Sequence, residues 1–249
     1  AVWLTGCVQE EFESTPSPAG NGIRFTLTVP DVNLPSVSSR TMTGTGTAKK
    51  EDEIETVDIL VFDMSKTPAV FLEWVSATGV TQDLADNSTV SFSAVLSPTT
   101  ASTCIVVVAN KELDNIVSGF TKGATTKVEA MEKMLHTQTG KWLADGSTTG
   151  GYTRIPMYGE KVISKITPSM DPITGINMKR MLARIDIRNN SATSNFTVEE
   201  VYLANYNTTG YIAPAWNTNG QVTDPVPDTP VLPAGSGKMT EEGDAILYS

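Results

Sequence analysis

The sequence has very few of the side chains that enzymes and metal proteins commonly use. Its 249 residues include one histidine, His136, and two cysteines, Cys7 and Cys104. One histidine without a partner thiol excludes the common catalytic triads, and the His/Cys spacing of zinc sites is absent. We therefore expect no enzyme, no metal and no cofactor. His136 is expected at the end of a helix rather than as a catalytic base.

Basic residues are also scarce. The chain has 18 Lys and Arg against 28 Asp and Glu, a net charge of -10. Phosphate binding requires a basic face, so this balance argues against nucleic acid as a partner. The apolar stretch at residues 1–6 is too short to span a membrane. The acidic surface is typical of a soluble, exported protein.

The residues that are plentiful are those of strands and turns. Hydrophobic residues make up 39% of the chain and charged residues 18%, which fits a globular β-rich protein. Strands are expected at residues 22–30, 54–62, 70–75, 89–96, 104–109, 178–187 and 196–205. The run CIVVVA is continuously apolar, which predicts a central strand covered on both faces. One helical region, in one or two pieces, is expected within residues 111–135.

About seven strands and a short helical insert predict an antiparallel β-sandwich. We divide the chain into a signal-peptide remnant, lipobox and linker (1–20), an N-terminal β-sandwich domain (21–209), and a connector with the start of a second β domain (210–249). The Pro- and Gly-rich stretch 208–238 is expected to be exposed. We expect the chain to be truncated within the second domain.

The two cysteines lie in different settings. Cys104 opens an apolar run and is expected to be a small buried hydrophobe. Cys7 ends the motif LTGC, which resembles a bacterial lipobox, and a polar tether follows it at once. Lipidation of Cys7 is therefore predicted, the alternative being a chance match. A Cys7–Cys104 disulfide is an alternative that nothing else in the sequence favours.

The segment 22–30 (GIRFTLTVP) alternates between apolar and mostly polar residues, which predicts a half-buried edge strand. Its apolar face consists of Ile23, Phe25, Leu27 and Val29. An open sheet edge is a template for strand addition. We interpret the segment as a strand that can be removed to leave a groove, the alternative being an ordinary edge strand that stays.

The predicted cleavage residue is Arg40. It ends a Pro- and Ser-rich stretch and is followed by Thr- and Gly-rich sequence, a context that suits a protease cleft. Arg24 is a rival, but it lies inside the predicted strand, where a protease could not reach the backbone.

The order of these motifs resembles the FimA-like fimbrillins, the type V pilus major subunits of Bacteroidales, in their N-terminal domain. The matching motifs are LTGC at 4–7, SSR at 38–40, VDILVFD at 57–63, CIVVVANKELDNIVSGFT at 104–121, IPMYGE at 155–160, MKRMLARIDI at 178–187, FTVEEVYLANYN at 196–207 and ILYS at 246–249. The resemblance implies a transthyretin-like sandwich and a structural role at the bacterial cell surface.

The resemblance also implies an assembly route. A precursor lipidated at Cys7 would be attached to the outer membrane, and an arginine-specific protease would cut after Arg40. A neighbouring fimbrial subunit would then donate a strand to build a homopolymer that supports adhesion to a host protein or glycan. Two alternatives stay open: an anchor or tip subunit, and a surface-lipoprotein carbohydrate-binding module with Trp74, Trp142 and Trp216 as a sugar platform.

Overall fold

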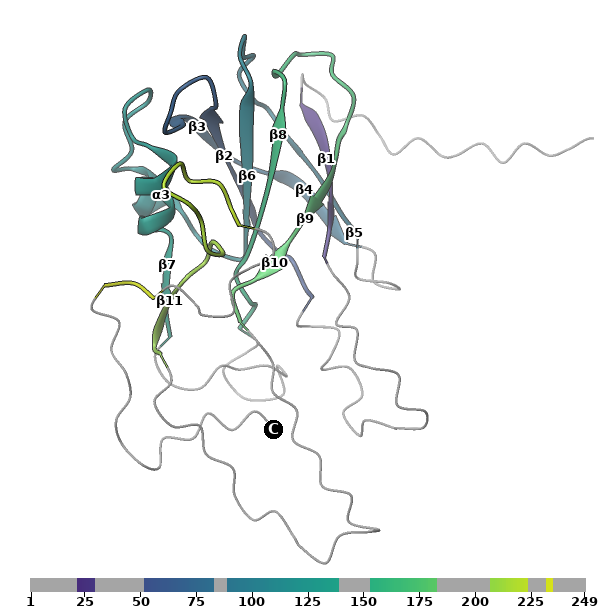
Figure 1. Cartoon of the computed structure of the whole chain (residues 1–249). Helices are drawn as coiled ribbons and strands as arrows, with labels where there is room; N and C mark the ends of the chain where they lie inside the picture. The colour runs from purple at the N-terminus through teal and green to yellow at the C-terminus, as the bar shows by residue number, and fades with distance from the viewer. Residues whose placement is uncertain are drawn as a thin grey trace, which may run out of the picture.

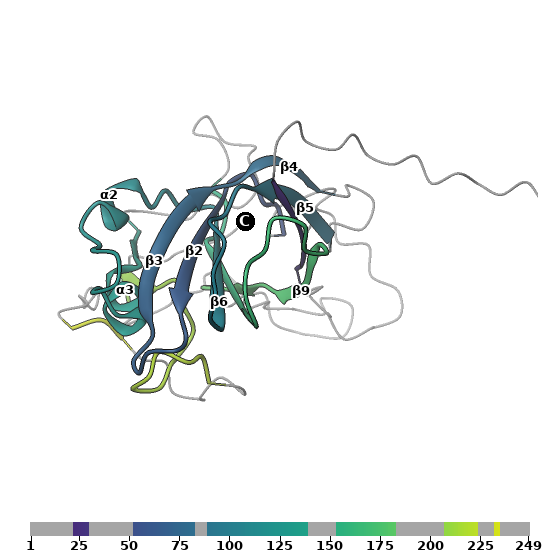
Figure 2. The same cartoon turned by 90° about the horizontal axis from the view of Figure 1, so that it is seen from above.

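The computed structural model describes residues 22–29, 52–82, 89–138, 153–182, 207–223 and 232–234. These residues form two facing β-sheets, with two short helices on the outer side of one sheet (Figures 1 and 2). Most neighbouring strands are antiparallel, so the predicted mostly-β sandwich is confirmed. Among the described residues, no helix is long and apolar enough to cross a membrane.

The first sheet, called here the β1 sheet, has four strands. In spatial order they are β4 (Thr78–Gln82), β5 (Thr89–Ala94), β1 (Ile23–Thr28) and β9 (Ile173–Asn177). The second, called the β6 sheet, has five strands. They are β10 (Lys179–Arg180), β8 (Met157–Ile163), β6 (Thr103–Ala109), β2 (Val57–Asp63) and β3 (Val70–Ser76).

The helices and a small ribbon complete the described elements. They are α2 (Asp114–Val117), α3 (Lys127–Lys133), and the ribbon of β7 (Leu135–Thr137) with β11 (Thr209–Tyr211). The helical region thus consists of two short pieces inside the predicted stretch. Thr126 caps α3 in a capping box with Glu129, which satisfies backbone donors at the helix start.

The β6 sheet is buried on both of its faces. In β6, Ile105 and Val107 point into the core between the sheets, while Cys104 and Val106 join a second core under α2 and α3. All seven residues of β6 are buried, and β6 is the third of the five strands. The prediction of a central strand covered on both sides is therefore confirmed.

The two sheets are connected by a bend between consecutive strands. β3 ends at Ser76 in the β6 sheet, and β4 begins at Thr78 in the β1 sheet, so Ala77 alone separates them. Figure 2 shows this path curving around one side of the sandwich. The sequence pattern predicts that this strand ends at residue 75, and it does not indicate β4.

The placement of His136 at a helix end is wrong. His136 lies in β7 and pairs with Gly210 of β11, because α3 ends at Lys133 and the chain turns at Met134 into an extended path. The segment 207–223, which contains β11, was expected to be part of an exposed connector. Instead, its strand pairs with β7. Ile212 and Ala213 are buried in the core under the helices.

The strand expected at 178–187 begins differently in the structure. Met178 separates β9 from β10, which belong to different sheets. Residues 183–187 of the expected strand lie outside the described residues. The strand expected at 196–205 lies outside the described residues. The division into domains at residue 209 stays a prediction.

Candidate functional site

The strand β1 lies inside its sheet rather than at an edge, so that part of the sequence prediction is wrong. It runs antiparallel to β5 through six residue pairs and parallel to β9 through three. The sequence did not reveal β9, because its buried residues Ile173 and Ile176 are three positions apart. Gly175, at φ +71°, interrupts the alternation between them.

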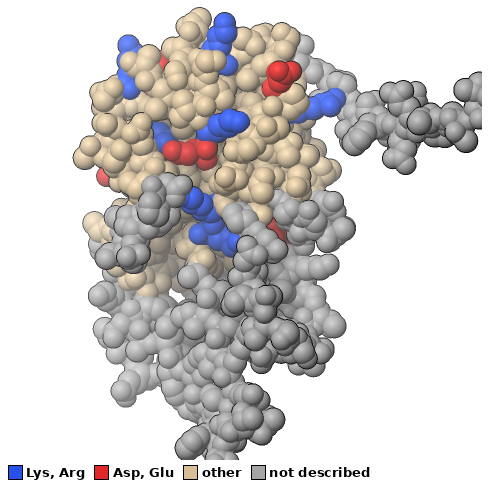
Figure 3. All heavy atoms as spheres, turned by 45° about the vertical axis from the view of Figure 1, so that its right-hand side comes forward, with Lys and Arg blue, Asp and Glu red and all other residues tan. Residues whose placement is uncertain are grey.

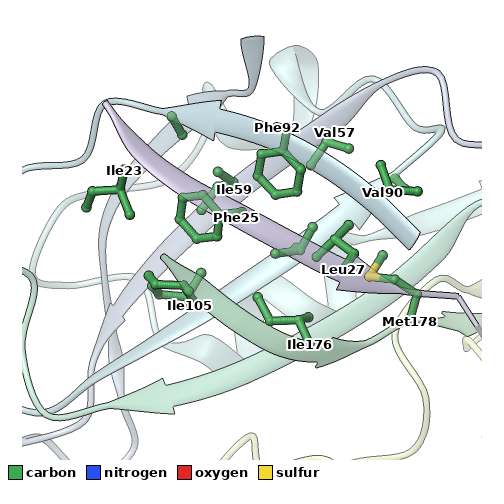
Figure 4. Close-up of a cluster of buried hydrophobic side chains, with 14 of the residues drawn as sticks. Ile23, Phe25, Leu27, Val57, Ile59, Val90, Phe92, Ile105, Ile176 and Met178 are labelled. Atoms are coloured by element: carbon green, nitrogen blue, oxygen red, sulfur yellow. The ribbon is translucent and has the colours of Figure 1, made fainter. Parts of the chain in front are cut away.

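The alternation within β1 is confirmed. Ile23, Phe25, Leu27 and Val29 are at most 4% exposed, whereas Arg24 on the opposite face is exposed. Figure 4 shows the labelled inward side chains of β1 lying between the two sheets. Their neighbours in this core come from both layers, with Val90 and Phe92 on β5, Ile176 on β9, and Val57, Ile59 and Ile105 on the β6 sheet.

One residue pair between β1 and β5 is aromatic. Phe25 is directly opposite Phe92, and the two rings are stacked with centroids 4.9 Å apart and an angle of 6° between their planes. Both residues are buried. Directly opposed aromatic pairs stabilise a sheet beyond the area that they bury. The sequence showed Phe92 only as part of an alternating strand, because a cross-strand partner depends on the register.

The other side of β1 is closed by β9 and the turn that follows it. The backbone amide of Met178 donates a hydrogen bond to the carbonyl oxygen of Thr28 at 2.9 Å. A Cβ atom added to Gly159 on β8 would lie 2.7 Å from Met178 Sδ and 2.8 Å from Ile176 Cγ2. A residue without a side chain is therefore required where β9 approaches the β6 sheet.

The burial of β1 has a large energetic effect. Burying an aliphatic or aromatic side chain contributes about 1.5–3 kcal/mol, so the four inward residues contribute on the order of 6–12 kcal/mol. A typical domain is stable by only about 5–15 kcal/mol. Without β1, or a strand in its place, the sandwich would thus lose most of its margin of stability.

The chain that follows residues 30–51 is fixed to elements other than β1, including Gln82 of β4 through hydrogen bonds with Ile54 and Asp52. Arg154 forms ion pairs with Glu53 at 3.2 Å and Glu55 at 2.9 Å, and Arg180 pairs with Asp52. These contacts lie on the strands and loops of the β6 sheet, not on β1. The segment between the two anchored ends contains Arg40, which lies outside the described residues, as does Cys7.

One group of buried titratable side chains, around Lys127, forms a structural cluster rather than a catalytic one. Lys127 Nζ lies 2.6 Å from Glu160 Oε2, which also accepts a hydrogen bond from the Tyr158 hydroxyl at 2.5 Å. Burial raises the pKa of the Cys104 thiol to about 12 and raises the pKa of Tyr158 well above its ordinary value. Cys104 is therefore an unreactive buried residue, as predicted, and it forms no disulfide.

Two of the three tryptophans proposed as a sugar platform pack against the core under the helices. Trp74 and Trp216 contact this core, and Trp216 also makes an edge-on contact with Tyr211 at 4.9 Å. Trp142 lies outside the described residues. A hollow of about 410 Å³ beside the turn between β8 and β9 is lined by residues such as Lys161 and Asp171, with no aromatic residue among its lining.

The visible surface near β1 carries few charges. Figure 3 shows scattered basic side chains and fewer acidic ones on a mostly uncharged described surface, with one acidic group lying beside basic ones. The outward residues of β1 and β5 are Arg24 and a set of hydroxyl side chains, namely Thr26, Thr28, Thr89, Ser91 and Ser93. The outward side chains of β1 and β5 are therefore polar, in contrast to their inward side chains, which are apolar and buried.

Comparison with known proteins identifies a family for this chain. The family model described as "Major fimbrial subunit protein (FimA)" matches residues 23–226. No curated protein matches the chain.

Solved structures that are similar in part include the following three. A fimbrial assembly protein from Parabacteroides distasonis is 13% identical, with a TM-score of 0.42, and the match covers 90% of this chain and 78% of that one. A candidate cell adhesion protein from the same species is 18% identical, with a TM-score of 0.44 and coverages of 90% and 65%. A candidate polysaccharide-binding protein from Bacteroides thetaiotaomicron is 13% identical, with a TM-score of 0.34 and coverages of 64% and 47%.

The chain thus spans about half to two thirds of the length of two of these structures. Their low TM-scores support no functional conclusion, so the assignment rests on the family model. Because that model matches most of the chain, the protein belongs to the family of FimA major fimbrial subunits, which are structural rather than enzymatic proteins of the cell-surface fimbrium.

Proposed function

We propose that this chain is a pilus subunit that is exported as a lipoprotein precursor and assembled by strand exchange. In this route an arginine-specific protease removes β1, and a strand from a neighbouring subunit takes its place. The observation that carries the proposal is the position of β1. It is an interior strand whose inward residues are at most 4% exposed, yet one cut between residues 30 and 51 would separate it from every other strand that the structure describes.

Removal of β1 would leave a slot suited to another strand. Both β5 and β9 would expose the backbone groups that now pair with β1, and the apolar side chains behind them would face water. Backbone hydrogen bonds and alternating apolar contacts are the two features by which an added strand is bound. Such a slot favours the strand of a second subunit over a globular partner.

Arg40 is the arginine that lies between β1 and the next described strand, β2. A protease binds its substrate in an extended form that must leave any existing sheet. The backbone of Arg24 is paired with Ser93 in the sheet, and Arg154 and Arg180 hold ion pairs. A cut after Arg40 would leave the remaining chain attached at Asp52 through its ion pair.

The lipid on Cys7 and the strand β1 would leave together. Both precede Arg40 in the sequence, so a single cut would release the subunit from the outer membrane and open its slot. This gives a reason for placing the anchor and the first strand in one removable segment. Adhesion to a host protein or glycan is proposed on family membership alone. An anchor or tip subunit would instead keep β1.

The proposal can be tested on the full-length protein. We would treat it with an arginine-specific protease, measure the intact mass, and examine unheated and heated samples by gel electrophoresis. We expect one cut after Arg40 and ladders of oligomers that disappear on heating. The Arg40→Ala variant should stay uncut and monomeric, while Arg24→Lys should behave like the unmodified protein. A cut that yields only monomers would contradict strand exchange, whereas a protein that is not cut would favour an anchor or tip subunit that keeps β1.

A further inference from the structure

The slot that β1 occupies has a different shape at each inward position. Along β5, the residues opposite β1 are Ala94, Phe92 and Val90, in the order in which β1 passes them. The residue is therefore small opposite Ile23, aromatic opposite Phe25 and branched opposite Leu27. A strand that enters this slot meets one aromatic surface, at the second inward position.

The position that Phe25 occupies is enclosed by both neighbouring strands. Phe25 lies opposite Phe92 on one side and opposite Ile173 of β9 on the other. The parallel rings of Phe25 and Phe92, 4.9 Å apart, show that this position fits a flat side chain. Protein interiors are close-packed, so a smaller side chain here would leave a void against the Phe92 ring.

We propose that the incoming strand is selected by an aromatic side chain that stacks on Phe92. The partner is an extended segment of the next fimbrial subunit with the pattern aliphatic-x-aromatic-x-aliphatic-x-aliphatic. Phe92 is then a specificity-determining residue of the slot. This inference rests on the proposed strand exchange and adds the chemistry of the strand that the slot accepts.

The size of the effect follows from the contact that is lost. Aromatic pairs contribute beyond their buried area, and this contribution corresponds to about a 2- to 10-fold change in affinity. An aliphatic residue such as leucine at the aromatic position would keep most of the burial but lose the stacking. Truncation to alanine would lose both and should weaken binding by roughly 100-fold or more.

The test uses synthetic peptides as probes. The full-length protein is cut after Arg40, the protease is inhibited, and a fluorescent peptide with the sequence of residues 22–30 is added to exchange with β1. Competing peptides carry Phe25→Leu, Phe25→Ala or, as the matched control on the exposed face, Thr28→Ala. We expect the Thr28→Ala peptide to compete like the unmodified one, Phe25→Leu to be weaker by about 2- to 10-fold, and Phe25→Ala to be weakest.

A change in the slot completes the test. In the Phe92→Leu protein we expect the preference for phenylalanine over leucine to disappear, while binding of the unmodified peptide persists at lower affinity. Equal competition by the Phe25 and Phe25→Leu peptides in the unmodified protein would overturn the selection by stacking and leave strand exchange intact. If no peptide entered the cut protein, the proposed strand exchange would fail together with this inference.

Discussion

Lys127 and Glu160 form an ion pair of 2.6 Å between a helix and a strand, and Lys127 is 1% exposed. The same Nζ donates a hydrogen bond at 2.6 Å to the carbonyl oxygen of Gly220. One ammonium group thus joins α3, β8 and the segment that follows β11. Because Lys127 is surrounded by protein, each partner is needed to offset the cost of burying its charge.

Replacing Lys127 by methionine should destabilise the protein by roughly 3 kcal/mol, at the lower end of the range for broken buried pairs, since the Glu160 side chain is 21% exposed. The reason is that the Glu160 carboxylate and the Gly220 carbonyl lose their charged donor. Chemical denaturation followed by fluorescence would measure the change. The double variant Lys127→Met/Glu160→Gln should be less destabilised than the single one, and equal losses would contradict this view of the pair.

The single histidine gives a direct test of burial at β7. Burial lowers the pKa of His136 below its ordinary value of 6.5, and nearby Lys111 acts in the same direction, while the hydrogen bond with Gln138 opposes them. The unfolded chain therefore takes up a proton before the folded one, so stability should fall as the pH falls below 6.5.

Titration by NMR should show one histidine signal with a pKa below 6.5. The His136→Gln variant should lose the part of the pH dependence that lies just below pH 6.5. A measured pKa at or above 6.5 would show that the ring is more solvated than its place in β7 suggests.

Gly159 tests the close approach of β9 to the β6 sheet. In Gly159→Ala the new methyl group would lie within 2.8 Å of Met178 and Ile176, and overpacking of this kind typically costs about 1–3 kcal/mol. The matched control is Gly119→Ala, where the nearest atom is 3.7 Å away. Thermal unfolding should show a clear loss of stability in the first variant and little change in the second. A Gly159→Ala protein as stable as the control would be inconsistent with the described packing.

Asn110 forms hydrogen bonds with the segment that follows the predicted cleavage segment. Its φ is 58°, and its side-chain amide donates to the carbonyl oxygens of Glu53 and Ile155 at 2.8 and 2.9 Å. It also accepts a hydrogen bond from the amide of Glu55 at 3.0 Å. Left-handed backbone favours Asn and Gly.

We expect Asn110→Ala to lose both the hydrogen bonds and the conformational preference, and Asn110→Gly to lose only the hydrogen bonds. Each lost bond is worth about 0.5–1.5 kcal/mol, so both variants should be less stable, the alanine variant more so. Urea unfolding curves would rank them. A glycine variant less stable than the alanine variant would argue against the backbone strain.

The parts of the fold that could be predicted from the sequence are those where burial imposes a simple period. The continuous apolar run of β6 indicates two covered faces, and the alternation from Ile23 to Val29 indicates one. In both cases the pattern reflects the environment of a single strand. The helical pieces could be predicted for the same reason, from apolar residues such as Met131 and Met134.

The relationships between strands could not be predicted in this way. The partner β9 was missed because Gly175 breaks the alternation between Ile173 and Ile176, so β1 was placed at an edge. The stack of Phe25 on Phe92 depends on a register that joins residues 67 positions apart. The slot is formed by several strands and depends on their register, so it could not be predicted. The alternation of the strand that fills it can be seen in that strand's own sequence.

The interior position of β1 affects the timing of assembly. If β1 left, β9 would lose its only described neighbour in the sheet, and β4 and β5 would remain as a strand pair, which is marginally stable by itself. Exposed apolar surface and open edges also promote aggregation. Under the proposed strand exchange, the form without β1 would be the subunit's most short-lived one, and the arriving strand would have to bind as β1 leaves.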